Sequence, residues 1–259
     1  MKLKNQDQAI QSLRSLAISD RHSIMIEGPL GSGKSYLARE YSKLLNCHNF
    51  VSVEPKVQDI CDVINQAYQT SEPVVICIEN LDTGVVAAAY AVLKFLEEPL
   101  PYIYIVVTCR SMWGVPDTIV SRSSVVTLSP PTAADLHEYV HDRYPDKYLD
   151  IETSPLWPCL NSFNTIDLAV DLSESQRDYI IELPQTLKEN DSVSTLMWKI
   201  QKFEDGSATP LELTIRYIIR NANAAAKAAG LRCLDDIASG RIAAHAAVAA
   251  FAFDYKYIE

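Results

Sequence analysis

The sequence contains no apolar stretch long enough to cross a membrane. Its longest apolar runs, such as Val74–Ile78 and Ile103–Val107, fall far short of the roughly 20 residues that a bilayer span requires. The first residues turn polar at once and are followed by Asp7, so they lack the apolar core of a secretory signal. These absences predict a soluble protein that has no membrane partner and is located in the cytoplasm.

Paired cysteines and excess positive charge are missing as well. The six cysteines include no C-x-x-C pair, which argues against a zinc site and a disulfide framework and predicts reduced, mostly buried thiols. Lys and Arg number 23 against 33 Asp and Glu, giving a net charge of −10. Because DNA binding draws on positive charge, any contact with nucleic acid must come from a local basic surface.

Between residues 23 and 128, short apolar runs alternate with helical patterns. This alternation is typical of parallel strands joined by crossover helices, and nearly continuous apolar strands suit a sheet covered on both faces. The predicted strands are Ser23–Ile26, Val74–Ile78, Ile103–Thr108 and Val125–Leu128, with Asn49–Val53 as a further, more weakly patterned candidate.

A different, helical pattern follows Ser129-Pro130-Pro131. Thr132 and Asp135 have the spacing of a helix N-cap, and Pro184 with the polar run from Lys188 to Ser192 marks a second boundary. We therefore predict an α/β nucleotide-binding domain over residues 1–130, a small helical lid over 131–187 and an all-α, collar-like oligomerisation domain over 188–259.

A phosphate-binding loop is the strongest motif in the chain. Residues 28–35 match the pattern G-x-x-x-x-G-K-S/T between a predicted strand and a predicted helix. Glycines let backbone N–H groups turn toward phosphates, the lysine reaches the terminal phosphates, and the hydroxyl can bind Mg²⁺. The motif predicts ATP as ligand, bound by Gly28, Pro29, Leu30, Gly31, Ser32, Gly33, Lys34, Ser35 and Tyr36.

The predicted strand Val74–Ile78 leads into a second, Walker B-like segment with Glu79, Asn80 and Asp82. Such a segment needs one carboxylate toward Mg²⁺ and a second polar group that positions or deprotonates the attacking water. We assign Mg²⁺ to Ser35 and Glu79. Asn80 stands where a glutamate is usual, and an amide can orient water but cannot take its proton. The alternative is that the two carboxylates are merely solvated at a strand end.

Four segments make the chain resemble the AAA+ ATPase subunits of bacterial sliding-clamp loaders, of the gamma and delta-prime type. The start, from Gln8-Ala9-Ile10 to Leu45-Asn46-Cys47, is similar to the opening of that family. The segment from Ala88 to Pro99 is close to the family's A-A-N-A-L-L-K-T-L-E-E-P helix and is far more specific than the phosphate loop alone.

The resemblance also implies roles for residues after this helix. Thr108, in the segment from Ile105 to Arg110, resembles the sensor 1 residue near the γ-phosphate. Arg122, between Pro116 and Ser123, resembles the arginine that reaches a neighbouring subunit's nucleotide. Lys94 lies on the helix that faces DNA in this family. The plainer alternatives are a surface ion pair for Arg122 and a solvated Lys94.

Taken together, the resemblance implies an ATPase that, with other loader subunits in a pentameric ring of like or unlike chains, opens a sliding clamp and loads it on primer-template DNA in a bacterial or phage-infected cell. The sequence departs from the family at Asn80, at Asp167 in place of the lid's sensor 2 arginine, and by lacking a zinc module between Cys47 and Val74. Two alternatives remain: a non-hydrolysing, delta-prime-like subunit that donates Arg122, and another AAA+ remodeller.

Overall fold

The computed structural model describes residues 7–19, 21–70, 72–187, 191–203, 206, 208–220, 222–239 and 242–258. The chain forms two compact units, of which the first ends at Pro131 and the second begins at Thr132. Among the described residues, no helix combines the length and apolar character needed to span a membrane. The second predicted boundary begins at Lys188, and residues 188–190 lie outside the described residues, so the three-domain scheme stays a prediction.

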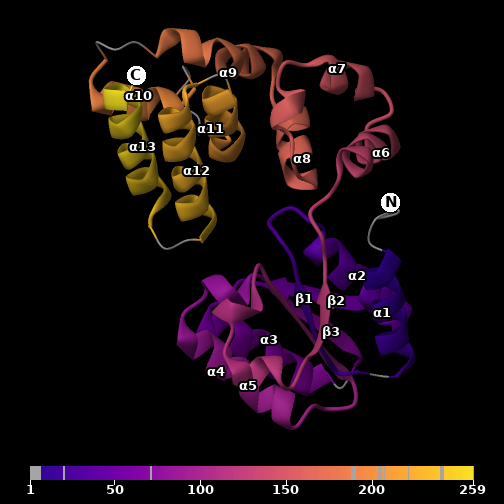
Figure 1. Ribbon diagram of the computed structural model, residues 1–259. Coiled ribbons are helices and arrows are strands. Elements are labelled where there is room, and N and C mark those ends of the chain that lie inside the picture. The colour runs from indigo at the N-terminus through magenta and orange to yellow at the C-terminus, as the bar shows by residue number, and fades with distance from the viewer. Residues whose placement is uncertain are drawn as a thin grey trace. The chain divides into compact units, whose positions relative to one another are not determined.

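The first unit contains a five-stranded parallel sheet in the order β2-β3-β4-β1-β5. Figure 1 labels three of its strands, β1, β2 and β3. Its strands are β1 (Ser23–Glu27), β2 (Asn49–Val53), β3 (Val74–Ile78), β4 (Ile103–Cys109) and β5 (Ser124–Thr127). In register, Ile78 of β3 lies beside Val107 of β4, and Glu27 of β1 lies beside Cys109 of β4. The residues that follow β1, β3 and β4 therefore meet at one edge of the sheet, where ligands bind in open α/β folds.

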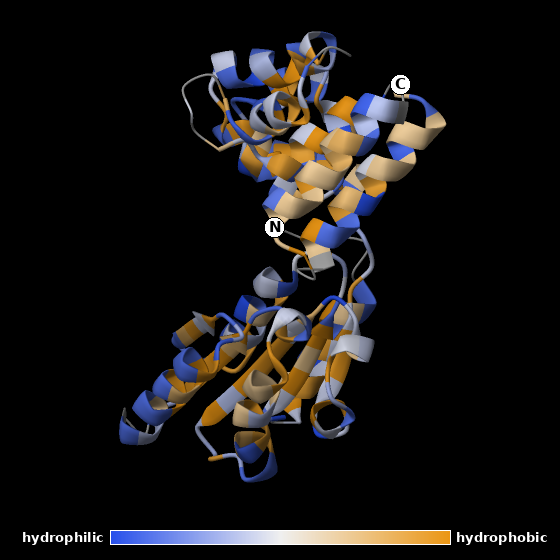
Figure 2. Cartoon of the chain, turned by 90° about the vertical axis from the view of Figure 1, so that its left-hand side faces the viewer, coloured by the Kyte–Doolittle hydropathy of each residue, from blue (hydrophilic) through white to orange (hydrophobic). Residues whose placement is uncertain are grey.

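Helices cover both faces of this sheet. All five residues of β3 are buried, and they alternate between two apolar clusters, with Ile76 and Ile78 in one and Val75 and Cys77 in the other. The strands lie as apolar orange bands between helices with polar outer surfaces (Figure 2). The cluster with Val75 and Cys77 includes residues of α1 (Asp7–Ile18) and α2 (Lys34–Leu44). The cluster with Ile76 and Ile78 includes residues of α3 (Val57–Thr70), α4 (Val86–Glu97) and α5 (Asp117–Val120).

The elements described in the second unit are α-helices and a short 3₁₀ helix. The predicted N-cap is present as a reciprocal capping box: the Asp135 N–H donates to Thr132 Oγ1 at 3.3 Å, and the Thr132 N–H donates to Asp135 Oδ2 at 2.8 Å. The elements are α6 (Ala133–Arg143), α7 (Tyr148–Thr153), η4 (Trp157–Cys159), α8 (Phe163–Asp171), α9 (Glu174–Thr186), α10 (Val193–Gln201), α11 (Leu211–Arg220), α12 (Ala224–Ser239) and α13 (Ala244–Ile258).

Pro184 lies inside α9 rather than after its end. The helix continues to Thr186, and the neighbouring Leu183 and Leu187 are buried in the same apolar cluster as residues of α10 to α13. Apolar side chains on both sides of residues 188–190 thus share one core. A proline inside a helix removes one backbone donor and costs about 3 kcal/mol, and the burial of its apolar neighbours offsets this cost.

Close packing of α12 on α11 gives a stability prediction at Gly230. A Cβ added there would lie 2.3 Å from Ile219 Cγ2 and 3.3 Å from Phe251 Cε2. Alanine gains about 1 kcal/mol of helix propensity over glycine, but overpacking costs about 1–3 kcal/mol. Gly230→Ala should therefore lower the free energy of unfolding, by up to about 2 kcal/mol, in denaturant titrations. In an Ile219→Ala background the same change should be neutral or stabilising, and destabilisation there would contradict the packing argument.

Candidate nucleotide-binding site

The loop between β1 and α2 has the backbone of a phosphate cradle. Gly31 and Gly33 adopt φ values of 69° and 93°, a region that glycine enters without strain. A Cβ at Gly28 would lie 2.8 Å from Ser32 Oγ and 2.9 Å from Leu128 Cβ. Backbone conformation thus favours glycine at residues 31 and 33, and close approach favours it at residue 28. The loop ends at the N-terminus of an eleven-residue helix.

Lys34 lies across this loop. Its Nζ donates to the carbonyl oxygens of Gly28 at 2.8 Å and Pro29 at 2.9 Å, and the residue is only 7% exposed. Burial lowers the pKa of Lys34, and the nearby Asp82 carboxylate opposes that shift more than any other group. The ammonium is therefore partly desolvated and held by neutral acceptors, which a phosphate oxygen can replace with a stronger, charge-assisted bond.

The remaining predicted loop residues surround Lys34. Ser32 is buried, and its hydroxyl donates to the Pro29 carbonyl at 2.8 Å. Ser35 and Tyr36 are half-buried in the first turn of α2, whereas Leu30 is 44% exposed at the tip of the loop. Burial raises the pKa of the Tyr36 hydroxyl.

The residues after β3 connect to β2 and β4. Ser52 Oγ donates to Glu79 Oε1 at 2.6 Å, and the backbone N–H of Asn80 donates to Thr108 Oγ1 at 2.9 Å. Asn80 has φ 48° and ψ 51°, a left-handed conformation that asparagine tolerates better than most residues. The structure thus brings Thr108, which is buried, directly to the Walker B-like segment.

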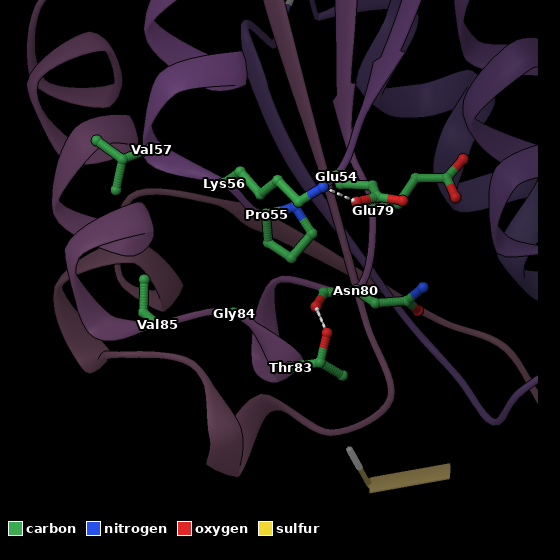
Figure 3. A pocket seen from close by; sticks show the side chains of 9 residues that line it. All are labelled: Glu54, Pro55, Lys56, Val57, Glu79, Asn80, Thr83, Gly84 and Val85. Atoms are coloured by element: carbon green, nitrogen blue, oxygen red, sulfur yellow. Dashed lines mark hydrogen bonds and ion pairs between the residues drawn. The ribbon is translucent and has the colours of Figure 1, made fainter. Parts of the chain in front are cut away.

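A hollow of about 610 Å³ opens beside Glu79 and Asn80 (Figure 3). Its other walls are the segment from Glu54 to Val57 and the segment from Thr83 to Val85. Within it, the Thr83 hydroxyl donates to the Asn80 carbonyl at 2.8 Å. These lining residues come from the ends of β2 and β3 rather than from the phosphate loop, so the hollow adjoins the Walker B-like segment and is distinct from the cradle.

Asp82, the second carboxylate of the Walker B-like segment, forms an ion pair with Arg110 that no motif in the sequence indicates. Arg110 Nε donates to Asp82 Oδ2 at 3.2 Å, and the Asp82 side chain is only 7% exposed. Asp82 Oδ1 is buried and has no hydrogen-bond partner in the part of the chain that the structure describes. Glu27, at the end of β1, is a further carboxylate without an assigned role. Its Oε1 accepts a hydrogen bond from the Met112 N–H at 2.9 Å.

Arg122 lies at the surface after α5. Its guanidinium pairs with Glu97 Oε1 at 3.0 Å and donates to the Thr118 carbonyl at 3.0 Å. The two paired side chains are 38% and 48% exposed, and such surface pairs contribute only about 0–1 kcal/mol. The contact is therefore easily exchanged for another anion. Lys94 is exposed on α4.

Asp167, at the position implied for a sensor 2 arginine, is engaged within the helical unit. Its Oδ1 accepts hydrogen bonds from the hydroxyls of Tyr139 and Tyr144, each at 2.7 Å, and Arg143 Nε lies 3.7 Å away. Burial, followed by the hydrogen bond to Asp167, raises the pKa of both tyrosines. The carboxylate has a structural role at a place where the family would have a cation.

The residues present fit a nucleotide with Mg²⁺. The loop is shaped by glycines, Lys34 is directed to its carbonyls, and a buried carboxylate oxygen of Asp82 is without a partner among the described residues. In that same part of the chain, no cluster of three or more His, Cys, Asp or Glu could hold a metal alone. A magnesium ion here would need phosphate oxygens and water as its other ligands, which is how Mg²⁺ usually binds.

Comparisons with a protein family and with a solved structure agree with the predicted fold. Residues 55–132 match the model of a family described as DNA polymerase III, delta subunit. A DNA polymerase III gamma subunit-related protein from Thermotoga maritima superposes with a TM-score of 0.54 and 19% identity, over 95% of this chain and 99% of that one. No curated protein sequence matches the chain.

More distant structures include a RuvB Holliday junction branch migration motor from Thermotoga maritima. It has 12% identity and a TM-score of 0.46 over 91% of this chain and 75% of that one, too low to carry an argument. The two stronger findings confirm the predicted AAA+ α/β fold with a helical second half, and the resemblance to a clamp-loader-like AAA+ subunit. The family match covers less than a third of the chain.

Proposed function

We propose that this chain is an ATP-binding subunit of a clamp loader, which opens a sliding clamp and loads it on primer-template DNA. The observation that carries the proposal is the buried Lys34 bound to the Gly28 and Pro29 carbonyls inside a glycine-shaped loop. The match of residues 55–132 to a DNA polymerase III delta subunit model supports the choice of a clamp loader among AAA+ functions.

Within the chain, each proposed residue has a separate task toward ATP. Backbone N–H groups of residues 28–35 and the helix N-terminus hold the phosphates, and Lys34 neutralises the terminal ones. Ser35 and Glu79 bind Mg²⁺, which polarises the transferred phosphoryl group when it is bound. Thr108 holds the Asn80 backbone, so a shift at the γ-phosphate can be passed between β4 and β3.

Across a subunit interface, Arg122 supplies the guanidinium that stabilises charge on a neighbour's γ-phosphate. Its pair with Glu97 keeps it at the surface in the single chain, and the pair is weak enough to exchange. The partners are other loader subunits in a ring, the clamp and primer-template DNA, with exposed Lys94 as a candidate phosphate contact. The helical lid and collar and a cytoplasmic location belong to the same proposal.

A second candidate is a subunit that binds nucleotide without hydrolysing it and mainly donates Arg122. Two observations favour it: the amide of Asn80 cannot take a proton from water, and Asp167 is bound to two tyrosines where a lid arginine is expected. The intact cradle and the buried Lys34 favour the first candidate, because a purely structural subunit has no need of either.

Asn80→Glu separates these candidates. If only the missing carboxylate limits hydrolysis, the variant should raise DNA-stimulated turnover by about 10- to 100-fold, because general base catalysis is commonly worth at least that much. Glutamate is less favourable than asparagine at φ 48°, so the variant should also lose about 1 kcal/mol of stability. Asn80→Gly, which suits the backbone but adds no carboxylate, is the control and should not raise turnover.

The proposed function as a whole is tested by steady-state ATP hydrolysis with partner subunits, with and without primed DNA and the clamp. Stimulation by DNA and clamp supports a hydrolysing loader subunit. ATP binding without turnover, in an assembly that still needs Arg122, supports the second candidate. Failure to bind ATP at all would remove both.

A further inference from the structure

We propose that Asp82 is an outer-sphere carboxylate of the nucleotide site, whose Oδ1 accepts a hydrogen bond from a water molecule carried by the Mg²⁺ of bound ATP. This inference rests on the proposed nucleotide-binding function. The residue that would contact the metal's water shell lies three positions beyond Glu79, on the short helix η2 (Leu81–Thr83).

The geometry of the pair leaves one oxygen of Asp82 for a ligand. Arg110 Nε occupies Oδ2 at 3.2 Å, while Oδ1 is buried and unpartnered among the described residues. Leaving a buried charged acceptor without a hydrogen bond costs more than about 1–3 kcal/mol, so such an atom calls for a specific explanation. A metal-bound water is a strong donor and removes that cost when the nucleotide binds.

The position of the carboxylate is fixed by its surroundings. A Cβ on Gly114 would lie 2.9 Å from Asp82 Cβ, so the 3₁₀ helix η3 (Met112–Gly114) packs directly on the base of the side chain. Arg110, directly after β4, holds the carboxylate end of the Asp82 side chain through the ion pair. A side chain held at both ends by packing and by an ion pair is preorganised, as outer-shell residues of metal sites are.

The location of Asp82 places it at the proposed phosphate site. The N–H of Gly28 in the phosphate loop donates to the Cys109 carbonyl at 3.1 Å, and Arg110, the next residue in the chain, pairs with Asp82. This chain of contacts places the carboxylate beside the loop, close to where the terminal phosphates and their metal would sit. Mg²⁺ commonly keeps several waters and uses only one or two carboxylates directly, which leaves waters for an outer carboxylate.

The test is a Mg²⁺ titration of a fluorescent ATP analogue bound to the full chain. Asp82→Asn should weaken the apparent Mg²⁺ affinity of the complex by about 10- to 100-fold, the usual cost of losing an outer-shell partner. Binding of the analogue in EDTA should change by less than about twofold, since the cradle and Lys34 remain. Asp62→Asn, which alters an exposed carboxylate on α3, is the matched control and should leave both values unchanged.

A second variant keeps the inference testable if Asp82→Asn does not fold. Arg110→Gln keeps the carboxylate but releases Oδ2, so it should weaken Mg²⁺ affinity by a smaller factor, of about three to ten, with little change in EDTA. Wild-type Mg²⁺ affinity in a folded Asp82→Asn, or in Arg110→Gln, would overturn the inference and leave nucleotide binding intact. Failure of the wild-type chain to bind the analogue would instead remove the proposed function.

Discussion

Lys34→Ala should reduce the affinity of the chain for ATP by about 100-fold, because a hydrogen-bonded ion contact to phosphate contributes about 1.5–3 kcal/mol and this lysine is already desolvated. The substitution also removes the bonds to the Gly28 and Pro29 carbonyls. Equilibrium binding of a fluorescent nucleotide to the full chain measures the change, and turnover should fall with it.

The matched control for this prediction is Lys43→Ala in the same helix. Lys43 is 71% exposed and pairs with the nearby Glu40, so its loss should leave ATP affinity within about twofold. Thermal unfolding of both variants shows whether the fold is retained. An affinity of Lys34→Ala equal to that of Lys43→Ala would mean that the glycine loop is not a phosphate site.

Arg122→Ala should lower DNA-stimulated ATP turnover of the assembled loader by about 10³-fold, the smaller end of the range for an arginine supplied to a transferring phosphoryl group. Nucleotide binding by the isolated chain should stay within about twofold, because Arg122 is bound to Glu97 and Thr118 rather than to the phosphate loop. The contrast between lost turnover and retained binding separates a residue acting on a neighbour from one acting on its own nucleotide.

Glu97→Gln supplies the comparison for Arg122. It removes the ion pair but leaves the guanidinium, so turnover should be unchanged or raised, and stability should change by less than about 1 kcal/mol. A loss of turnover in Glu97→Gln equal to that in Arg122→Ala would point to a structural ion pair. The plainer interpretation of Arg122 from sequence would then hold.

The strands of the sheet could be predicted because both of their faces are apolar. Val74–Ile78 is predicted with the bounds that the structure has. The predicted strands that begin at Ser23 and Ile103 end one residue too early, and the one predicted from Val125 is shifted by one residue. Asn49–Val53 was harder, because β2 is an edge strand with largely exposed residues and so lacks a continuous apolar run.

The site was only partly predictable. Motif spacing pointed to Lys34 and Asn80, and the family resemblance pointed to Thr108. The hydrogen bond from the Asn80 N–H to Thr108 Oγ1 joins two segments that lie 28 residues apart in the sequence. The pair of Asp82 and Arg110 spans the same distance along the chain but follows no spacing rule, because the parallel register of β3 and β4 alone brings it together. The side-chain partners of Arg122 and Asp167 were equally hidden.

Pro184 shows the limit of boundary signals. A proline followed by polar residues predicts a break, yet α9 continues past Pro184 and Leu187 joins the core formed by α10 to α13. Burial of a few apolar side chains outweighs one lost helical hydrogen bond. A local signal for a boundary therefore says little about which helices share a core, and that depends on tertiary packing.

Retention of the clamp on primed circular DNA, measured with this chain, its partner subunits and the clamp in the presence and absence of ATP, tests the central proposal most directly. We expect ATP-dependent retention that is lost when Lys34→Ala replaces the wild-type chain. Retention that is independent of ATP, or that survives Lys34→Ala unchanged, would contradict the proposal that nucleotide bound to this chain drives clamp loading.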